Sequence, residues 1–329
     1  MKLRACLLLA AIAAAQAGTA LRLQAQAEAD ALAQANTALQ AGEADKALGL
    51  LQPVIGQNAN GSEAHNLACR VWLIVGRLDE ATSECEKAAS LDPQSSANHL
   101  WLGRVLGERA DHASFLSAYG LAKRVRSEFE EAVRLDSKNA EALASLGEFL
   151  CSAPGIVGGG LDKAEAVAAQ LDKVDPPRAH ELRAQIAEQR KDYDAAEREL
   201  KQAIAVGLHP AYQWMALASF YRRRGRWDDM IAAVRSGASA ARRDKHATVA
   251  LYNGAGTLAR ANRELPMAAK MLEDYLASPN KTEEAPAFVA YARLARVNEQ
   301  LGDQQAASQD RAAAVALAHD YKLGQGSKH

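Results

Sequence analysis

The sequence predicts an all-α fold, a right-handed α-solenoid superhelix of antiparallel helical hairpins, from three observations. A pattern of small and large apolar residues recurs about every 34 residues from residue 28 onward. Good helix formers are abundant, β-branched residues are sparse, and no segment reads as a strand. Prolines fall where helices should end, in Asp92-Pro93, Asp175-Pro176 and His209-Pro210. A hairpin of this size cannot bury its own apolar face, so successive hairpins must stack.

The clearest repeat spans residues 62–95. Its apolar and turn residues are His65, Ala68, Cys69, Trp72, Gly76, Ala81, Cys85, Ala88 and Pro93. This pattern resembles the tetratricopeptide repeat, in which small residues mark the places where two helices approach closely. The resemblance, to a tetratricopeptide repeat protein of an exported bacterial type, implies a surface that binds other proteins and has no catalytic role.

The same frame divides residues 18–329 into a single solenoid of eight repeats and a short disordered tail at 322–329. The repeats are 28–61, 62–95, 96–139, 140–176, 177–210, 211–244, 249–282 and 288–321. The third repeat is longer by about ten residues, inserted around Asp111 to Val125. The turn between the two helices of the fourth repeat is also lengthened, by an insertion at Gly155 to Gly160.

The N-terminus reads as a secretory signal peptide over residues 1–17. Lys2 and Arg4 precede an apolar run, and Ala15-Gln16-Ala17 supplies a cleavage site. We therefore expect an exported protein, periplasmic or secreted, with no stable membrane span after cleavage. The mature chain would carry a formal net charge of about −3, because cleavage removes two of the 39 basic residues and none of the 40 acidic residues. This balance argues against nucleic acid as a partner.

Cys69 and Cys85 lie at similar heights of one hairpin. An oxidising compartment would permit a disulfide between them. Packed helix axes lie about 8–10 Å apart, however, which makes the geometry marginal. Buried free thiols are therefore the favoured interpretation, with the disulfide left open.

Adding His65 and His99 to the two cysteines would give a ligand set for zinc. The spacing of these four residues matches no familiar zinc module, however, and we expect neither metal nor cofactor.

Two further segments have ordinary structural explanations. The turn 153–160 lacks the Gly-Lys-Ser/Thr of a phosphate loop and follows no strand, so its glycines are expected to serve the turn itself. The basic segment Tyr221 to Trp227 fits a solvated helix end, because cations favour a helix C-terminus. No constellation joins a nucleophile, a base and an oxyanion donor, so we expect no enzymatic activity.

The resemblance also implies which residues line the concave groove. At the family's groove-facing positions stand Asn36, Asn66, Arg70, Arg104, Tyr212, Arg222, Arg223, Asn253, Arg260 and Arg296. Arginine recurs, and its guanidinium pairs bidentately with carboxylates. The expected partner is a protein or peptide segment, possibly with acidic groups. Binding of a chaperone's C-terminal tail is disfavoured. Family members that bind such tails hold the terminal carboxylate with a set of Lys, Asn and Arg residues, and only Asn36 agrees with that set here. The alternative is a module that binds a small ligand or a cell-envelope polymer.

Overall fold

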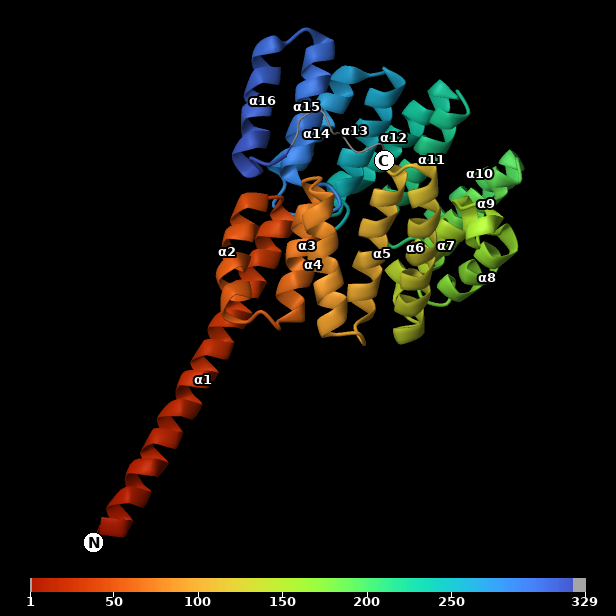
Figure 1. Cartoon of the computed structure of the whole chain (residues 1–329). Helices are drawn as coiled ribbons and strands as arrows, with labels where there is room; N and C mark the ends of the chain where they lie inside the picture. Colours follow the sequence, from red (N-terminus) through yellow and green to blue (C-terminus); the bar gives the residue numbers. More distant parts are fainter. Residues whose placement is uncertain (1, 322–329) are drawn as a thin grey trace.

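The computed structural model describes residues 2–321, with side chains described from residue 22, and within that range it contains α-helices, one short 3-10 helix and no strand (Figure 1). The elements are α1 (Lys2–Ala41), α2 (Ala44–Gln57), α3 (Ser62–Ile74), α4 (Leu78–Leu91), α5 (Ser96–Asp111), α6 (Phe115–Leu135), α7 (Ala140–Ser152), η1 (Gly155–Val157), α8 (Leu161–Leu171), α9 (Pro176–Gln189), α10 (Tyr193–Val206), α11 (Ala211–Arg223), α12 (Trp227–Arg243), α13 (Val249–Ala261), α14 (Leu265–Ala277), α15 (Ala287–Leu301) and α16 (Gln304–Leu317). The all-helical prediction is confirmed.

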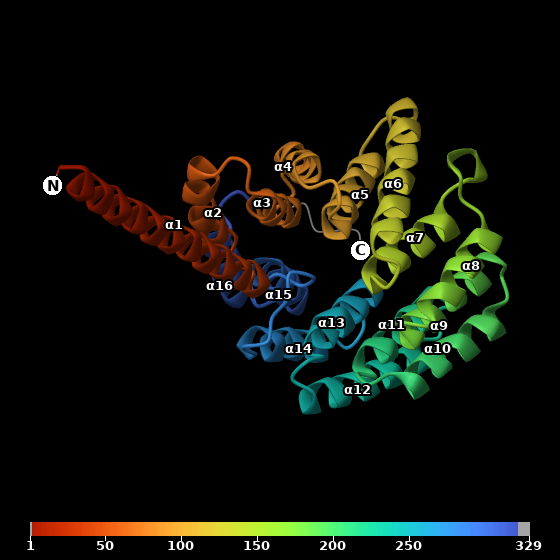
Figure 2. The ribbon, with the colours of Figure 1, turned by 90° about the horizontal axis from the view of Figure 1, so that it is seen from below.

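Each odd-numbered helix packs against the even-numbered helix that follows it. The odd-numbered helices also contact one another in succession, from α1 to α15. Seen end-on, they form the inner wall of a curved stack, and the even-numbered helices form the outer wall (Figure 2). The concave side is therefore built from the first helix of every repeat.

The turn inside most hairpins requires a residue in the left-handed backbone conformation. Glycine supplies it at Gly42, Gly76, Gly225 and Gly302, with φ between 69° and 86°. The equivalent position in the fifth repeat is Lys191, with φ of 62°. Glycine adopts this conformation at no steric cost, whereas a residue with a Cβ is strained there. The recurrence of glycine in the repeat is therefore explained by the backbone conformation of the turn, just as the recurrence of small apolar residues is explained by helix packing.

Small residues stand where the helices cross most closely. Gly147 shows this best, because a Cβ at that position would lie 2.3 Å from Cδ2 of Leu182 on α9. Four alanines at small-residue positions of the repeat are fully buried, namely Ala81, Ala132, Ala196 and Ala218. The predicted small-residue packing is confirmed at these positions.

Cys69 and Cys85 form a disulfide, so the expectation of free thiols is wrong. Their Cα atoms are 5.2 Å apart. The estimate from ordinary helix spacing failed because α3 and α4 meet through small, fully buried residues, among them Ala81 and Ala88, which let the two backbones approach. Cys151 is a buried free cysteine, and burial raises the pKa of its thiol.

The two histidines of the zinc alternative have carboxylate partners. His65 contacts Glu84 at 2.5 Å, and His99 contacts Glu128 at 2.6 Å. His180 contacts Glu199 in the same way at 2.7 Å, from the equivalent position of the fifth repeat. These pairs join the two helices of a hairpin. Within the described part of the chain, no three His, Cys, Asp or Glu side chains are grouped so that they could hold a metal ion.

The first and last repeats meet. Phe288 of α15 and Tyr321 belong to the same apolar cluster as Leu39 of α1 and Val75 after α3. His319 contacts Asp45 at 2.9 Å across this junction. Figures 1 and 2 show the C-terminal helices lying against the N-terminal ones, so the stack curves through one turn until its ends touch.

Both predicted insertions lie between the helices of a hairpin. The first lengthens α6 at its N-terminal end, leaving Phe115 and Leu116 exposed. The second is the turn at η1, which is closed by its own backbone, since the Gly160 N–H donates to the Leu150 carbonyl at 2.8 Å. A Cβ on Gly159 would lie 1.8 Å from the Ala153 carbonyl oxygen. The close approach of the Ala153 carbonyl therefore explains Gly159, and the positive φ of 98° explains Gly158.

The ends of the chain bear on the export prediction without testing it. Helix α1 runs through the predicted signal peptide and projects away from the body of the stack (Figure 1). None of the helices in the described range is long and apolar enough to cross a membrane. Cleavage and export stay predictions, and the predicted tail at 322–329 lies outside the described residues.

Candidate binding groove

A cluster of arginines lies on the inner helices of the last three repeats. Arg222 comes from α11, Arg260 from α13 and Arg293 from α15, and their charges influence one another. The outer faces of these helices are covered by α12, α14 and α16. Arg222 and Arg260 stand at groove-facing positions of the repeat, and Arg293 packs beside them against α13, so we call these three residues the arginine cluster.

Among the described residues, Arg293 is held in place by Tyr252 and has no carboxylate within ion-pair distance. Its guanidinium lies 3.8 Å from the centre of the Tyr252 ring, and Nη1 donates to the Tyr252 carbonyl at 3.2 Å. It crosses α13 at Gly256, where a Cβ would lie 2.4 Å from Nη1. Burial lowers the pKa of Arg293. A glycine on the neighbouring helix thus makes room for a partly buried cation.

Arg222 also lacks a carboxylate within ion-pair distance among the described residues, and its Nε is buried with no hydrogen-bond acceptor. The pKa of Arg260 is lowered, first by burial and then by Arg293 and Arg222, although part of the Arg260 side chain reaches solvent. Cations that repel one another raise the free energy of the folded state, and an anion bound among them would relieve that repulsion.

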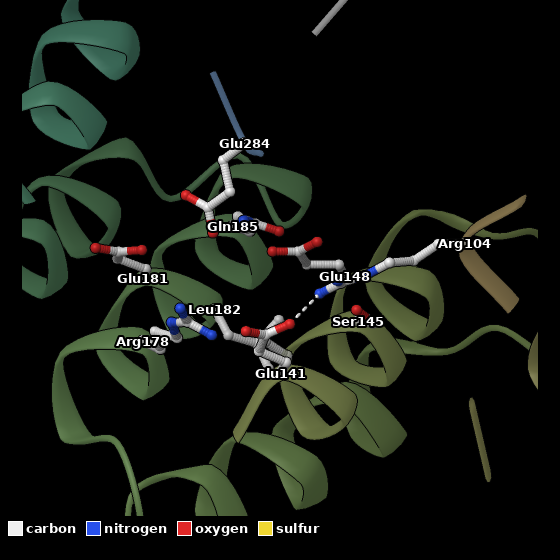
Figure 3. Close-up of a pocket in the computed structure, with 10 residues that line it drawn as sticks. Arg104, Glu141, Ser145, Glu148, Arg178, Glu181, Leu182, Gln185 and Glu284 are labelled. Carbon is white, nitrogen blue, oxygen red and sulfur yellow. Dashed lines mark hydrogen bonds and ion pairs between the residues drawn. The ribbon is translucent and has the colours of Figure 1, made fainter. Parts of the chain in front are cut away.

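The first half of the groove has a different character. A cavity of about 170 Å³ lies between α5, α7 and α9, and four carboxylates, Glu141, Glu148, Glu181 and Glu284, line it together with Arg104 and Arg178 (Figure 3). Arg104 pairs with Glu141 at 2.9 Å. Burial raises the pKa of Glu181 to about 7, and it raises the pKa of Glu284. The volume is below the roughly 300–1,000 Å³ of most small-ligand pockets.

Two arginines of this half stack on one tryptophan. Arg70 lies 5.0 Å and Arg104 4.5 Å from the centre of the Trp101 ring. Arg70 also donates two hydrogen bonds to Glu283, from the segment between α14 and α15. The aromatic ring therefore orients two guanidinium groups beside the cavity.

No family model matches the sequence, and no curated protein matches it. Solved structures do match. The chain is similar to TTC0263, a thermophilic TPR protein of Thermus thermophilus, with 19% sequence identity and a TM-score of 0.50 over 59% of this chain and 98% of that one. The chain has the tetratricopeptide-repeat fold. It is also similar to the MamA protein (18% identity, TM-score 0.42, 55% of this chain and 92% of that one) and to the APC/C hetero-tetramer Cut9–Hcn1 (18%, 0.46, 79% and 47%).

Within this tetratricopeptide-repeat stack, the predicted groove residues fall into two groups. Arg222 and Arg260 belong to the arginine cluster, and Arg296 lies close to Arg293 of that cluster. Arg223, although nearby, pairs with Glu188 at 3.0 and 2.5 Å. Arg70 and Arg104 lie in the first half with Trp101. Both groups lie on inner helices of the same curved stack. Their role in binding stays a prediction.

The remaining predicted residues are more varied. Asn36 and Asn253 are exposed. Tyr212 is half-buried, donates to the His246 carbonyl at 3.0 Å, and has its pKa raised to about 12 by burial. Asn66 is buried, and its amide donates to Asn98 at 3.0 Å, so it links neighbouring repeats inside the stack.

Sequence reasoning missed Arg293, Trp101 and the acidic pair Glu283-Glu284. Arg293 does not stand at a groove position of the repeat, and only its neighbour Gly256 hints at a large side chain nearby. Glu283 and Glu284 lie between the seventh and eighth frames, where the repeat pattern has nothing to say. The only sign of their role in the sequence is that two adjacent glutamates, in Thr-Glu-Glu-Ala-Pro, stand in a long connection between helices.

Proposed function

We propose that this chain is an exported, non-enzymatic scaffold that binds an extended, carboxylate-rich protein segment along its concave face. The observation that carries the proposal is the arginine cluster, where Arg222 and Arg293 present cations with no carboxylate of their own in the described structure. Guanidinium forks bind carboxylates bidentately, which provides both affinity and orientation.

An extended segment suits the groove better than a compact ligand. The arginines are spread over α11, α13 and α15, and Arg70 and Arg104 continue the line on α3 and α5. A chain in extended form advances about 3.3 Å per residue and can contact successive inner helices. The cavity beside Arg104 is small and rich in carboxylates, which gives little support to the alternative of a small-ligand or polymer-binding module.

The test begins with capture of partners from an envelope extract and their identification by mass spectrometry. Binding of the recovered partner is then measured by calorimetry for the wild type, for Arg222→Gln/Arg260→Gln, and for Arg235→Gln as a control. Arg235 is an exposed arginine on the outer helix α12, at 3.6 Å from Glu264.

We expect the double variant to bind at least about tenfold more weakly and with a shallower salt dependence, because charge-assisted bonds contribute about 1.5–3 kcal/mol each. The control should bind as the wild type does. Equal affinity of all three proteins at low salt would place binding elsewhere on the molecule.

A further inference from the structure

The connection between α14 and α15 crosses the groove. It comprises residues 278–286, Ser-Pro-Asn-Lys-Thr-Glu-Glu-Ala-Pro, and is longer than the connection at 207–210 between α10 and α11. Both ends are anchored: Thr248 donates to the Asn280 carbonyl, and the Tyr275 hydroxyl donates to the Ala285 carbonyl at 2.5 Å. We call this the acidic connection.

Its two glutamates contact the opposite end of the chain. Glu283 accepts two hydrogen bonds from Arg70, of 2.9 and 2.7 Å, and both side chains are about 15% exposed (16% and 14%). The Glu283 N–H donates to Oε1 of Gln40 on α1 at 3.3 Å. Glu284 lines the cavity with Arg104 and Arg178 (Figure 3). The acidic connection therefore lies on the inner helices of the first five repeats.

This contact has the chemistry that the proposed function requires of an outside partner. A non-helical segment with adjacent carboxylates lies on the concave face, and one carboxylate is gripped bidentately. The receiving surface is ordered in advance, because Arg70 and Arg104 both stack on Trp101. We define these three residues as the receiving surface.

We propose that the receiving surface binds extended segments that carry adjacent glutamates, and that the acidic connection is its built-in occupant, which an outside segment of the same chemistry displaces. The existence of such an outside partner rests on the proposed function. The recognition itself rests on contacts within this chain, first of all the Arg70–Glu283 pair, together with the placement of Glu284 beside Arg104.

Competition between the two segments follows from their linkage. A tethered segment has an effective concentration in the millimolar range, so a free segment that contacts only the receiving surface competes poorly. A partner that also reaches the arginine cluster gains additional contacts and can displace the acidic connection. Apparent affinity then rises in proportion to the fraction of molecules in which the receiving surface is vacant.

The experiment uses a fluorescein-labelled synthetic peptide that copies residues 278–286, with both ends blocked, and measures its anisotropy. The proteins are the wild type, the opened variant Glu283→Gln/Glu284→Gln, and the opened variant with Arg70→Gln/Arg104→Gln. We expect the opened variant to bind the peptide at least about tenfold more tightly than the wild type, because its own occupant is weakened. Binding should be lost with the two arginines, and a peptide with glutamine at both glutamate positions should not bind.

Peptide affinity that is the same for the wild type and the opened variant, or that survives the loss of both arginines, would overturn the proposal. Should the opened variant fail to fold, amide hydrogen exchange of the wild type serves instead. Saturating peptide must then accelerate exchange in residues 278–286, and unchanged exchange overturns the proposal.

A second comparison separates this inference from the proposed function. Arg222→Gln/Arg260→Gln, introduced into the opened variant, should leave peptide binding unchanged, because those arginines lie outside the receiving surface. The same pair should weaken binding of the envelope partner. Weakened binding of the synthetic peptide by this variant would contradict the inference about the receiving surface. Unchanged binding of the envelope partner would contradict the proposed function.

Discussion

Arg70 and Glu283 form a bidentate ion pair although 213 residues separate them in the chain. The pair is largely withdrawn from solvent, at 16% and 14% side-chain exposure. It joins the second repeat to the connection before the eighth, so it fixes the curvature of the stack as well as a local contact. The stability of the whole should therefore depend on it.

We expect Arg70→Gln and Glu283→Gln each to destabilise the fold, and the double variant to be less destabilised than the sum. Removing one partner leaves the other charge partly buried and unpaired, which costs more than removing both. A coupling free energy of about 1–3 kcal/mol is expected, below the buried-pair range because the site is not fully enclosed. Urea denaturation of all four proteins measures it, and strict additivity would show that the two side chains are not coupled.

The disulfide should contribute measurably to stability. Cys69 and Cys85 are 16 residues apart, and cross-linking a loop of this length stabilises by about 3 kcal/mol in the chain-entropy account. A reductant should lower the urea midpoint of the wild type and leave that of Cys69→Ala/Cys85→Ala unchanged. A wild type indifferent to reductant would mean that the bridge does not form in solution.

Lys191→Gly should stabilise the protein. Lys191 has a positive φ of 62° at the turn position that four other repeats fill with glycine. Relief of the left-handed strain, about 1–2 kcal/mol, outweighs the added freedom of the unfolded chain by roughly 0.5–1 kcal/mol. The converse change, Gly302→Ala, should destabilise by strain alone, since a Cβ there meets no neighbour. Thermal melting of both variants, with Lys191→Ala as the control, tests the pair of expectations.

Glu181 should make stability fall as the pH rises. Burial raises its pKa to about 7, so the folded state holds a proton that the unfolded state has already released above about pH 4.5. This contribution is complete below pH 4.5 and is lost as the pH rises through 7, and it amounts to at most roughly 3 kcal/mol. Glu181→Gln should flatten the decline in urea stability between pH 5 and pH 8. Asp162→Asn, at a carboxylate fully in solvent, should leave the decline in place.

The local part of the fold could be predicted from the sequence, because each repeat carries its own packing code. The alanines at 81, 132, 196 and 218 and the turn glycines are readable one hairpin at a time. The prediction for Cys69 and Cys85 was wrong because it assumed the usual distance between packed helices. Small residues let the two helices of this hairpin approach more closely.

Long-range contacts could not be predicted in this way. The meeting of the first and last repeats results from small rotations added up over eight hairpins, and no residue pattern encodes their sum. Arg70 was expected to face an outside acid, and it instead holds Glu283, which lies between two frames. The arginines could be assigned to the groove by position, but which of them already have a carboxylate could be learned only from the assembled stack.

Contact between the first and last repeats also imposes an order in time. Leu39 of the first hairpin shares its apolar cluster with Phe288 and Tyr321, which the ribosome adds only after all the hairpins between them. Throughout synthesis the early hairpins therefore keep an uncovered apolar edge, and chains cut short before α15 would keep it permanently. The nascent protein depends on rapid completion or on a chaperone that shields this edge, and that dependence ends only when residue 321 has emerged.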